Sequence, residues 1–350
     1  MEIEREVLLA SFTTFQIGGR ARFFARVRTP QDLKEALEWG EKEKVPFFVL
    51  GGGSNLLISD DGFPGLVIKI EIGGVSLKEE GEVFQVVAGA GEPWDPFVVR
   101  TIESGLSGLE NLSGIPGTVG GTPVQNVGAY GVEVGTAIAW VEAYSMKTYK
   151  KRLFQNTDCQ FGYRTSFFKT EEGRQWIITR VAFHLSKNGA PNLSYREVRD
   201  YFTNRETPPT PLEVREAVLL IRSRKFPDIK VIGTAGSFFK NPAVDSTTLA
   251  KLLKEFPDLP HFPLRGGGSK IALGALLERL QWKGVRRGRV GVFEKQSLVL
   301  VNYGGSTAQE MREFAENIIR DVREKTGIEI VPEIVFIGDR LQIPGDLPRG

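Results

Sequence analysis

Apolar runs and amphipathic segments alternate along the first part of the chain. Three apolar runs predict buried strands, at residues 45–51, 65–70 and 82–91. Before the first run, Thr29-Pro30-Gln31-Asp32 has the signature of a helix start, with a capping hydroxyl, a proline at the first helical position and an acid in the first turn. This alternation predicts a small α/β unit.

The pattern changes further along the chain. Residues 100–185 are richer in glycine and end in an apolar run that predicts a strand at 176–185. The sequence TPPTPLE at 207–213 predicts a turn or a domain boundary, because proline interrupts regular structure. The remaining elements expected from the sequence are strands at 231–236 and 328–338, and helices at about 247–255, 271–280 and 308–325. Thr307 and Glu310 form a capping box for the last helix, and Gly327 ends it.

Composition excludes several classes of protein. The 350 residues suggest two or three domains, and a net charge of +2 does not favour nucleic-acid binding. One cysteine permits no intrachain disulfide and no Cys-based zinc site, and two histidines argue against a multi-histidine metal centre, so no metal is expected. No long apolar window and no signal peptide are evident, so we expect a protein of a reducing compartment that does not enter a membrane.

Glycine is the unusual component, with 40 residues gathered in blocks beside predicted strands. The sequence LGGGSNLL at 50–57 follows a strand directly and can present several backbone N–H groups in one direction, as phosphate-binding turns do. It matches neither the G-x-G-x-x-G fingerprint nor a Walker loop. A tight turn at the strand exit is an equally good interpretation.

A second glycine-rich segment runs from residue 107 to 131. It is too long for a turn and too apolar for a linker. Ile115-Pro116-Gly117 followed by Gly120-Gly121 suggests a backbone pressed against a flat or extended ligand, and we favour that interpretation over an irregular core loop.

Four polar residues stand out in apolar surroundings. Arg164 needs an anionic partner, either a structural carboxylate or a substrate. Ser237 lacks a G-x-S-x-G elbow, so it is a poor candidate for a hydrolase nucleophile but a possible proton donor. Lys270 ends a GGGSK sequence that suits either an anion site or a hinge. Glu333 is costly to bury unless it is paired or protonated, and the alternative is a solvent-facing position beside Pro332.

Taken in order, these motifs resemble one protein family. TTFQIGG at 13–19, GGGSNLL, GIPGTVGG, QNVGAYG, FGYR, GSFFKNP and PEIVFIG at 332–338 are together similar to the UDP-N-acetylenolpyruvoylglucosamine reductases. The resemblance covers nearly the whole chain. It includes NLSYREV at 192–198, which resembles the tyrosine-bearing, substrate-closing loop of one form of the family.

The resemblance implies an α+β fold. An FAD-binding module of the p-cresol methylhydroxylase (PCMH)/vanillyl-alcohol oxidase type, built from two α/β subdomains, would precede a C-terminal α+β substrate-binding domain. We place the first subdomain at 1–70, the second at 71–212 with the module spanning about 17–188, and the substrate-binding domain at 213–350.

The resemblance also implies a reaction. The enolpyruvyl ether of UDP-N-acetylglucosamine would be reduced to UDP-N-acetylmuramate, in the synthesis of peptidoglycan precursors, with NADPH as co-substrate and FAD bound non-covalently. Flavin N5 would deliver hydride to C3, and Ser237 would donate the proton to C2. Arg164 and Glu333 would contact the carboxyl end of the substrate.

Further residues acquire roles by the same resemblance. The implied cofactor-binding residues are Gly51, Gly52, Gly53, Ser54, Asn55, Ile115, Pro116, Gly117, Gly120, Gly121, Asn126 and Gly128. The implied substrate-binding residues are Tyr130, Tyr163, Tyr195, Lys225, Asn241, Lys270 and Gln296. We expect a cytoplasmic monomer that binds no nucleic acid.

Two alternatives remain from the sequence. An oxygen-using flavin oxidase of the same module often carries covalent FAD, but Cys159 and the two histidines lie outside the flavin motifs. A nucleotide-sugar binding protein without catalysis would not need Ser237, Arg164 and Glu333 together.

Overall fold

The computed structural model describes residues 1–187, 189–264, 266–338 and 341–342. The chain forms two compact units that interleave along the sequence. Unit 1 contains residues 1–5, 23–52 and 65–223, and unit 2 contains residues 6–22, 53–64 and 224–350. The chain therefore passes from unit 1 to unit 2 between Gly52 and Gly53, inside the turn formed by residues 51–53, the first glycine turn.

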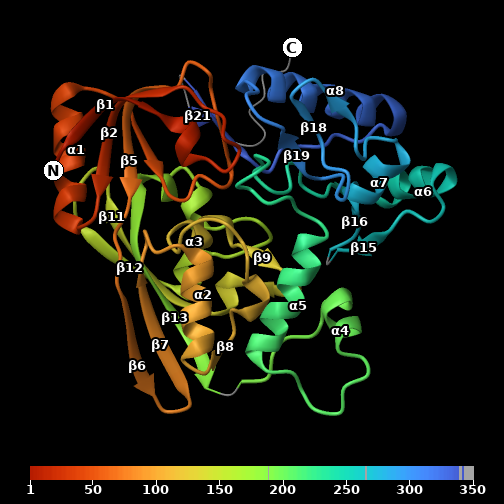
Figure 1. Cartoon of the computed structure of the whole chain (residues 1–350), viewed down its shortest axis with the longest axis horizontal. Helices are drawn as coiled ribbons and strands as arrows, with labels where there is room; N and C mark the ends of the chain where they lie inside the picture. Colours follow the sequence, from red (N-terminus) through yellow and green to blue (C-terminus); the bar gives the residue numbers. More distant parts are fainter. Residues whose placement is uncertain (188, 265, 339–340, 343–350) are drawn as a thin grey trace. The chain divides into compact units, whose positions relative to one another are not determined.

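Helices occur in both units (Figure 1). The α-helices are α1 (Pro30–Glu43), α2 (Trp94–Glu103), α3 (Gly121–Gln125), α4 (Arg196–Tyr201), α5 (Pro211–Ser223), α6 (Ser246–Glu255), α7 (Leu273–Arg279) and α8 (Ala308–Thr326). Short 3₁₀ helices lie at Leu9–Phe12, Glu110–Leu112, Val134–Thr136, Asn156–Cys159, Phe167–Lys169 and Gly173–Gln175. Among the described residues, no helix combines the length and apolar character that a membrane crossing requires.

Two sheets organise the N-terminal half of the chain. The four-stranded sheet has the order β1 (Ile3–Leu8), β2 (Arg20–Val27), β5 (Phe63–Ile70) and β3 (Phe47–Leu50), and β3 and β5 run parallel. The larger sheet has the order β12 (Lys151–Gln155), β11 (Ile138–Ser145), β13 (Trp176–Lys187), β7 (Val83–Gly89) and β6 (Val75–Glu80), and β8 (Leu106–Ser107) also pairs with β13. β9 (Gly128–Ala129) and β10 (Val132–Glu133) form a small hairpin.

Helix α2 packs on the larger sheet of unit 1, beside β13 (Figure 1). The ring of Phe183, on β13, lies 5.1 Å from that of Phe97 and 6.0 Å from that of Trp94. All three side chains are almost fully buried, and aromatic burial of this kind contributes strongly to the stability of a core. Packing in this core therefore fixes the position of α2. The second glycine-rich segment, residues 107–131, begins shortly after α2 ends.

Unit 2 has three small sheets. Their strand orders are β14 (Ala243–Val244), β16 (Ser269–Ile271), β15 (His261–Pro263); β17 (Arg286–Arg287), β18 (Val290–Val292), β19 (Leu300–Asn302); and β21 (Leu341–Gln342), β20 (Val335–Ile337), β4 (Leu56–Ile58). Helix α8 buries Met311, Phe314 and Ile318 in the core of this unit. Its start has the expected capping box between Thr307 and Glu310.

Two sequence-based strand predictions were wrong. Residues 231–236 form no strand, and the segment is held by an isolated bridge between Gly233 and Asn302. Only Val335–Ile337 of the predicted strand 328–338 is a strand, because Pro332 has no N–H and its neighbours bond to a separate segment. The break between the units falls at Ser223 and Arg224, beyond the proline-rich segment, while the division into three domains stays a prediction.

Candidate active site

The two glycine-rich segments meet within unit 1. A Cβ atom added to Gly52 would lie 2.4 Å from the Cα of Gly117, and one added to Gly51 would lie 3.1 Å from Oγ1 of Thr118. The first distance is shorter than any side chain tolerates, so only glycine allows this approach of two backbones. Two segments that are distant in the sequence thus form one glycine-lined surface.

The second segment is held by the chain just before α2. The N–H groups of Val119 and Gly120 donate to Glu92 O and Ala90 O, both at 2.9 Å. A Cβ atom at Gly120 would come within 2.5 Å of the Ala90 Cβ, so this position also requires glycine. Ile115, Pro116 and Gly117 remain half-buried, whereas Gly121 is exposed at the start of α3.

Thr118 supplies a test of whether this surface suits a ligand. Its side chain is buried, at 7% exposure, and its hydroxyl has no hydrogen-bond partner in the described part of the chain. Buried hydroxyls normally have a partner, so an unsatisfied one beside a glycine-lined surface fits a ligand with acceptor oxygens, such as a diphosphate. Sequence reasoning included its neighbours but missed Thr118, although GIPGTVGG contains it.

Asn126 organises the region around Arg164. Its side-chain amide donates to Glu133 Oε2 (2.8 Å) and to Gly162 O (2.9 Å), and its side-chain oxygen accepts from the N–H of Gly135 (3.0 Å). The amide is thus occupied by protein partners on both sides. Its role in the structure is to fix the turn 162–165, from which Arg164 projects.

Arg164 lies beside the β9–β10 hairpin. A Cβ atom at Gly128 would lie 3.1 Å from Nη1 of Arg164, and the guanidinium carbon lies 5.5 Å from the centre of the Tyr163 ring. The backbone of Arg164 has φ of 55°, an uncommon value for a residue with a side chain. The ammonium of Lys169 donates to its carbonyl at 2.9 Å and helps to hold that conformation.

Two predicted substrate tyrosines come together in unit 1. The rings of Tyr130 and Tyr195 lie 5.2 Å apart at 86°, and Tyr195 immediately precedes α4. The side-chain amide of Asn111 joins the two segments, because it donates to Tyr130 O and to Asn192 O, both at 2.9 Å. Burial raises the pKa of Tyr130 to about 12, so its hydroxyl stays protonated at neutral pH.

Arg222 of α5 faces the same region and was missed by sequence reasoning. Burial lowers the pKa of its guanidinium, while its hydrogen bond to Tyr130 opposes that change. A Cβ atom at Gly114 would lie 3.1 Å from its Nε, so α5 packs closely on the start of the second glycine-rich segment. No local motif marks Arg222, because its partners are distant in the sequence.

The segments that bear Ser237 and Glu333 pair through their backbones within unit 2. The N–H of Glu333 donates to the carbonyl of Phe238 at 2.7 Å, and Ser237 itself forms a bridge with Val299. The side-chain amide of Asn55 donates to Glu333 O at 3.3 Å, and the backbone carbonyl of Asn55 accepts from the N–H of Val335 at 3.0 Å. Both Ser237 and Glu333 are half-buried, so Glu333 has neither the strand position nor the full burial considered from sequence.

The start of α7 gathers three other predicted residues of unit 2. The side-chain oxygen of Asn241 accepts from the N–H of Leu273 at 3.0 Å, and a Cβ atom at Gly274 would lie 3.0 Å from Oε1 of Gln296. Lys270, on β16, has its ammonium 5.9 Å from the ring centre of Phe262. Lys225, Gly53 and Ser54 also belong to unit 2.

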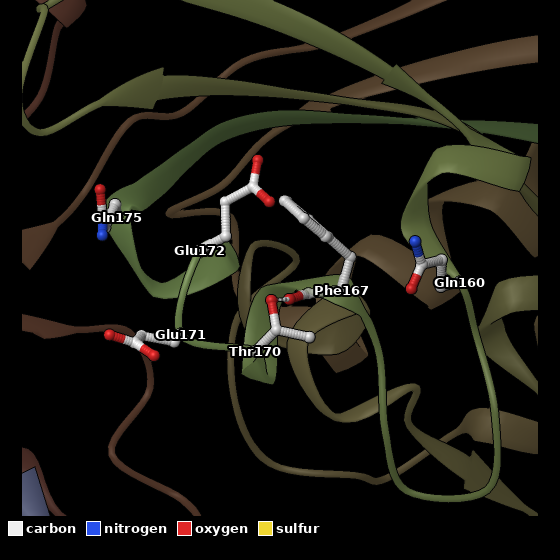
Figure 2. A pocket seen from close by; sticks show the side chains of 6 residues that line it. All are labelled: Gln160, Phe167, Thr170, Glu171, Glu172 and Gln175. Carbon is white, nitrogen blue, oxygen red and sulfur yellow. Dashed lines mark hydrogen bonds between the residues drawn. The ribbon is translucent and has the colours of Figure 1, made fainter.

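An open depression of about 500 Å³ in unit 1 involves none of these residues. Figure 2 shows its lining, in which Thr170 donates to the carbonyl of Phe167 at 2.7 Å. The residues that line it are Gln160, Phe167, Thr170, Glu171, Glu172 and Gln175. This lining has two carboxylates and no basic side chain, so it does not suit an anionic nucleotide.

Comparison with known proteins decides the family. Residues 21–148 match the family of FAD binding domains, and residues 227–337 match the C-terminal domain of UDP-N-acetylenolpyruvoylglucosamine reductase. The reductases of that name from Pseudomonas aeruginosa and Bdellovibrio bacteriovorus are each 43% identical to this chain. The matches cover 95% of this chain and 98% and 99% of theirs, respectively. The chain belongs to the UDP-N-acetylenolpyruvoylglucosamine reductase family.

A solved structure agrees. The crystal structure of UDP-N-acetylenolpyruvylglucosamine reductase from Thermus caldophilus matches with a TM-score of 0.69 and 27% identity, over 97% of this chain and all of that one. The resemblance and the α+β fold class expected from the sequence are therefore confirmed. As a member of the family, the chain is an oxidoreductase of peptidoglycan precursor synthesis with an FAD-binding domain.

Proposed function

We propose that the protein reduces UDP-N-acetylglucosamine enolpyruvate to UDP-N-acetylmuramate with NADPH. The observation that carries the proposal is the backbone hydrogen bond from Glu333 to Phe238, which joins the segment of Glu333 to the residue that follows Ser237. The names of the relatives point to the same substrate. In the reaction, hydride adds to C3 of the enolpyruvyl group, a proton adds to C2, and NADPH becomes NADP⁺.

Ser237 donates the proton at C2. A hydroxyl is a weak acid, so it can act only on a strongly basic carbon and from a fixed position. The structure supports that fixed position, because Phe238 donates to Leu298 O at 2.8 Å and accepts from Glu333. Solvent returns the proton to Ser237 after each turnover.

Arg164 and Glu333 act on the carboxyl end of the substrate. The guanidinium of Arg164 stabilises the negative charge that develops toward the carboxylate when hydride reaches C3, as a preoriented cation should. Asn126 supports this role by fixing the turn that bears Arg164. Glu333 contributes as a hydrogen-bonding partner, since a bare carboxylate would repel the developing charge.

The cofactor is FAD, bound without a covalent link. When bound, it passes hydride from NADPH to the substrate. Gly51, Gly52, Gly117 and Thr118 suit its diphosphate, because they combine a surface without side chains and an unsatisfied buried hydroxyl. Burial raises the pKa of Cys159 to about 12, so this thiol is a poor candidate for attachment. Acid precipitation should therefore release all flavin into the supernatant.

The proposed contacts to the nucleotide end of the substrate come from the residues that the family resemblance implies. Tyr195 closes over the diphosphate, with Tyr130 behind its ring, and Tyr163 contributes from the FGYR motif. Asn241, Gln296, Lys225 and Lys270 supply hydrogen bonds and positive charge. Support comes from the grouping of Asn241 and Gln296 at the start of α7.

An anaerobic titration followed by visible absorption tests the function. Flavin bands should bleach with NADPH and return when the enolpyruvyl nucleotide sugar is added. A protein that gains no flavin bands with added FAD is not a flavoenzyme. Recovery only on admission of oxygen would instead favour the oxidase alternative.

The variant Ser237→Ala tests the proton donor. Flavin reduction by NADPH should persist, while turnover with the enolpyruvyl substrate should fall at least about a hundredfold, as expected for loss of a positioned acid. Ser223→Ala, at an exposed position of α5, is the matched control. A smaller fall would remove Ser237 from the proton-donating role.

A further inference from the structure

Lys69 contacts the first glycine turn, and neither the sequence motifs nor the proposed function includes this residue. Lys69 lies on β5, opposite Leu50 at the end of β3 in the parallel register. Its ammonium donates a hydrogen bond to the carbonyl of Gly51, the residue that follows β3 directly. The contact therefore joins the sheet to the turn that leaves it.

Lys69 is half-buried. Burial lowers the pKa of its ammonium, and the negative charge of Glu71 opposes that change. Glu71 is itself engaged by two arginines, since its oxygens lie 3.0 Å from Arg26 Nη1 and 3.4 Å from Arg28 Nε. Partial burial of an ammonium group costs desolvation free energy. The hydrogen bond to the carbonyl of Gly51 compensates part of that cost.

The bond has a geometric consequence for the turn. In a trans peptide the C=O of one residue and the N–H of the next point in opposite directions. Because the carbonyl of Gly51 points to Lys69, the N–H of Gly52 points away from it. The Cα of Gly52 is meanwhile fixed against Gly117, which leaves the peptide little freedom to rotate.

We propose that Lys69 is a positioning residue for FAD, which fixes the peptide between Gly51 and Gly52 so that the N–H of Gly52 is held toward the diphosphate. The inference rests on the FAD binding proposed above. An N–H group that is already oriented binds an anion more tightly than one that must first be ordered. Lys69 therefore acts through the backbone rather than by direct contact with the cofactor.

The test is the affinity for FAD of the full-length variant Lys69→Met. Methionine keeps most of the apolar stem but cannot donate to Gly51. FAD is removed from the protein and titrated back, and binding is followed by flavin fluorescence. The expected dissociation constant is about tenfold to a hundredfold higher than that of the wild type, the range for loss of a hydrogen bond from a charged donor. Lys34→Met, at an exposed position of α1, should bind FAD as the wild type does.

Two further measurements separate positioning from other effects. The melting temperature of the FAD-free variant should stay close to that of the wild type, because removal of the partly buried charge offsets the loss of the hydrogen bond to Gly51. The dependence of FAD affinity on salt should keep its slope, since a cation that touches the diphosphate would change it. If Lys69→Met does not fold, Lys69→Gln, whose amide is too short to reach Gly51, carries the same expectation.

The outcomes are distinct. A dissociation constant within threefold of the wild type, or a flatter salt dependence, overturns the role of Lys69 as a positioning residue. A wild-type protein that binds no FAD contradicts the proposed function instead.

Discussion

The rings of Tyr130 and Tyr195 meet edge to face, with their centres 5.2 Å apart and their planes at 86°. Tyr130 is buried and Tyr195 is half-buried, so the pair joins the core to the surface of unit 1. Tyr130 also has φ of 49°, a strained value for an aromatic residue. The segment that bears Tyr195 thus packs against Tyr130, a buried residue with a strained backbone conformation.

This contact leads to a prediction for Tyr195→Phe. Phenylalanine keeps the ring contact and loses only the hydroxyl proposed to reach the substrate diphosphate. The KM for the enolpyruvyl nucleotide sugar should rise roughly tenfold with kcat nearly unchanged, because one hydrogen bond of ground-state binding is lost. Steady-state kinetics measures both constants. Tyr201→Phe, on the exposed face of α4, serves as the control, and an unchanged KM would count against the closing role.

Asn126→Asp should impair both the fold and catalysis. The carboxylate would lose two donated hydrogen bonds and would face the carboxylate of Glu133. Leaving buried groups unsatisfied costs about 1–3 kcal/mol each, so the free energy of unfolding should fall by at least that amount. Turnover should fall further than stability explains, because the turn that bears Arg164 is released.

Denaturant unfolding and steady-state kinetics check the two effects of this substitution. Asn204→Asp, at an exposed position beyond α4, is the matched control and should change neither. Loss of stability with normal kcat would show that Asn126 supports the fold without positioning Arg164.

Local chemistry made part of the fold predictable. The helix starts at Thr29 and Thr307 are predictable because their signals are local: a capping hydroxyl, proline and acid at 29–32, and a capping box between Thr307 and Glu310. The segment 231–236 was predicted wrongly as a strand, because its apolar residues resemble one while its backbone partners lie elsewhere in unit 2. Gly233 pairs with Asn302, and Thr234 donates to Thr14. No pattern within a short window reveals such partners.

The residues of the candidate site also fall into two groups, those that sequence motifs predict and those that only the structure reveals. Ser237, Arg164 and Glu333 are predicted because their motifs resemble a family, whereas the backbone hydrogen bond that joins Glu333 to the residue after Ser237 came only from the structure. Asn111 and Lys69 carried no motif. Asn111 acts on Asn192, 81 residues away, and Lys69 acts on a carbonyl, which every residue possesses.

Gly52→Ala should weaken FAD binding without a change of charge. The added Cβ would lie 2.4 Å from Gly117, so one of the two glycine segments must move. Overpacking of this kind typically costs about 1–3 kcal/mol, and we expect a lower melting temperature together with a dissociation constant for FAD raised about tenfold or more. Gly338→Ala is the control, because its Cβ would meet Ser59 at an ordinary 3.6 Å. Wild-type FAD affinity in Gly52→Ala would place the diphosphate elsewhere.

The ion pair between Asp95 and Arg215 should make stability depend on pH in the acid range. Arg215 donates to both carboxylate oxygens of Asp95, and the N–H of Gly114 donates to the same group at 2.6 Å. Burial alone would raise the pKa of Asp95, but these hydrogen bonds outweigh it and lower the pKa below its usual value. The carboxylate therefore ties α5 and the second glycine-rich segment to α2.

The sign of the effect follows from that lowered pKa. The unfolded chain takes up a proton at Asp95 near pH 3.9, before the folded protein does, so the stabilisation is complete above that pH and is lost as the pH falls through the folded value. Asp95→Asn should lower the free energy of unfolding by about 1–3 kcal/mol at pH 7, and the difference from wild type should shrink below about pH 4. Urea unfolding from pH 3 to 7 measures it, with the exposed Asp61→Asn as control. A difference that stays constant across this range would show that the charge of Asp95 does not contribute to the stability of unit 1.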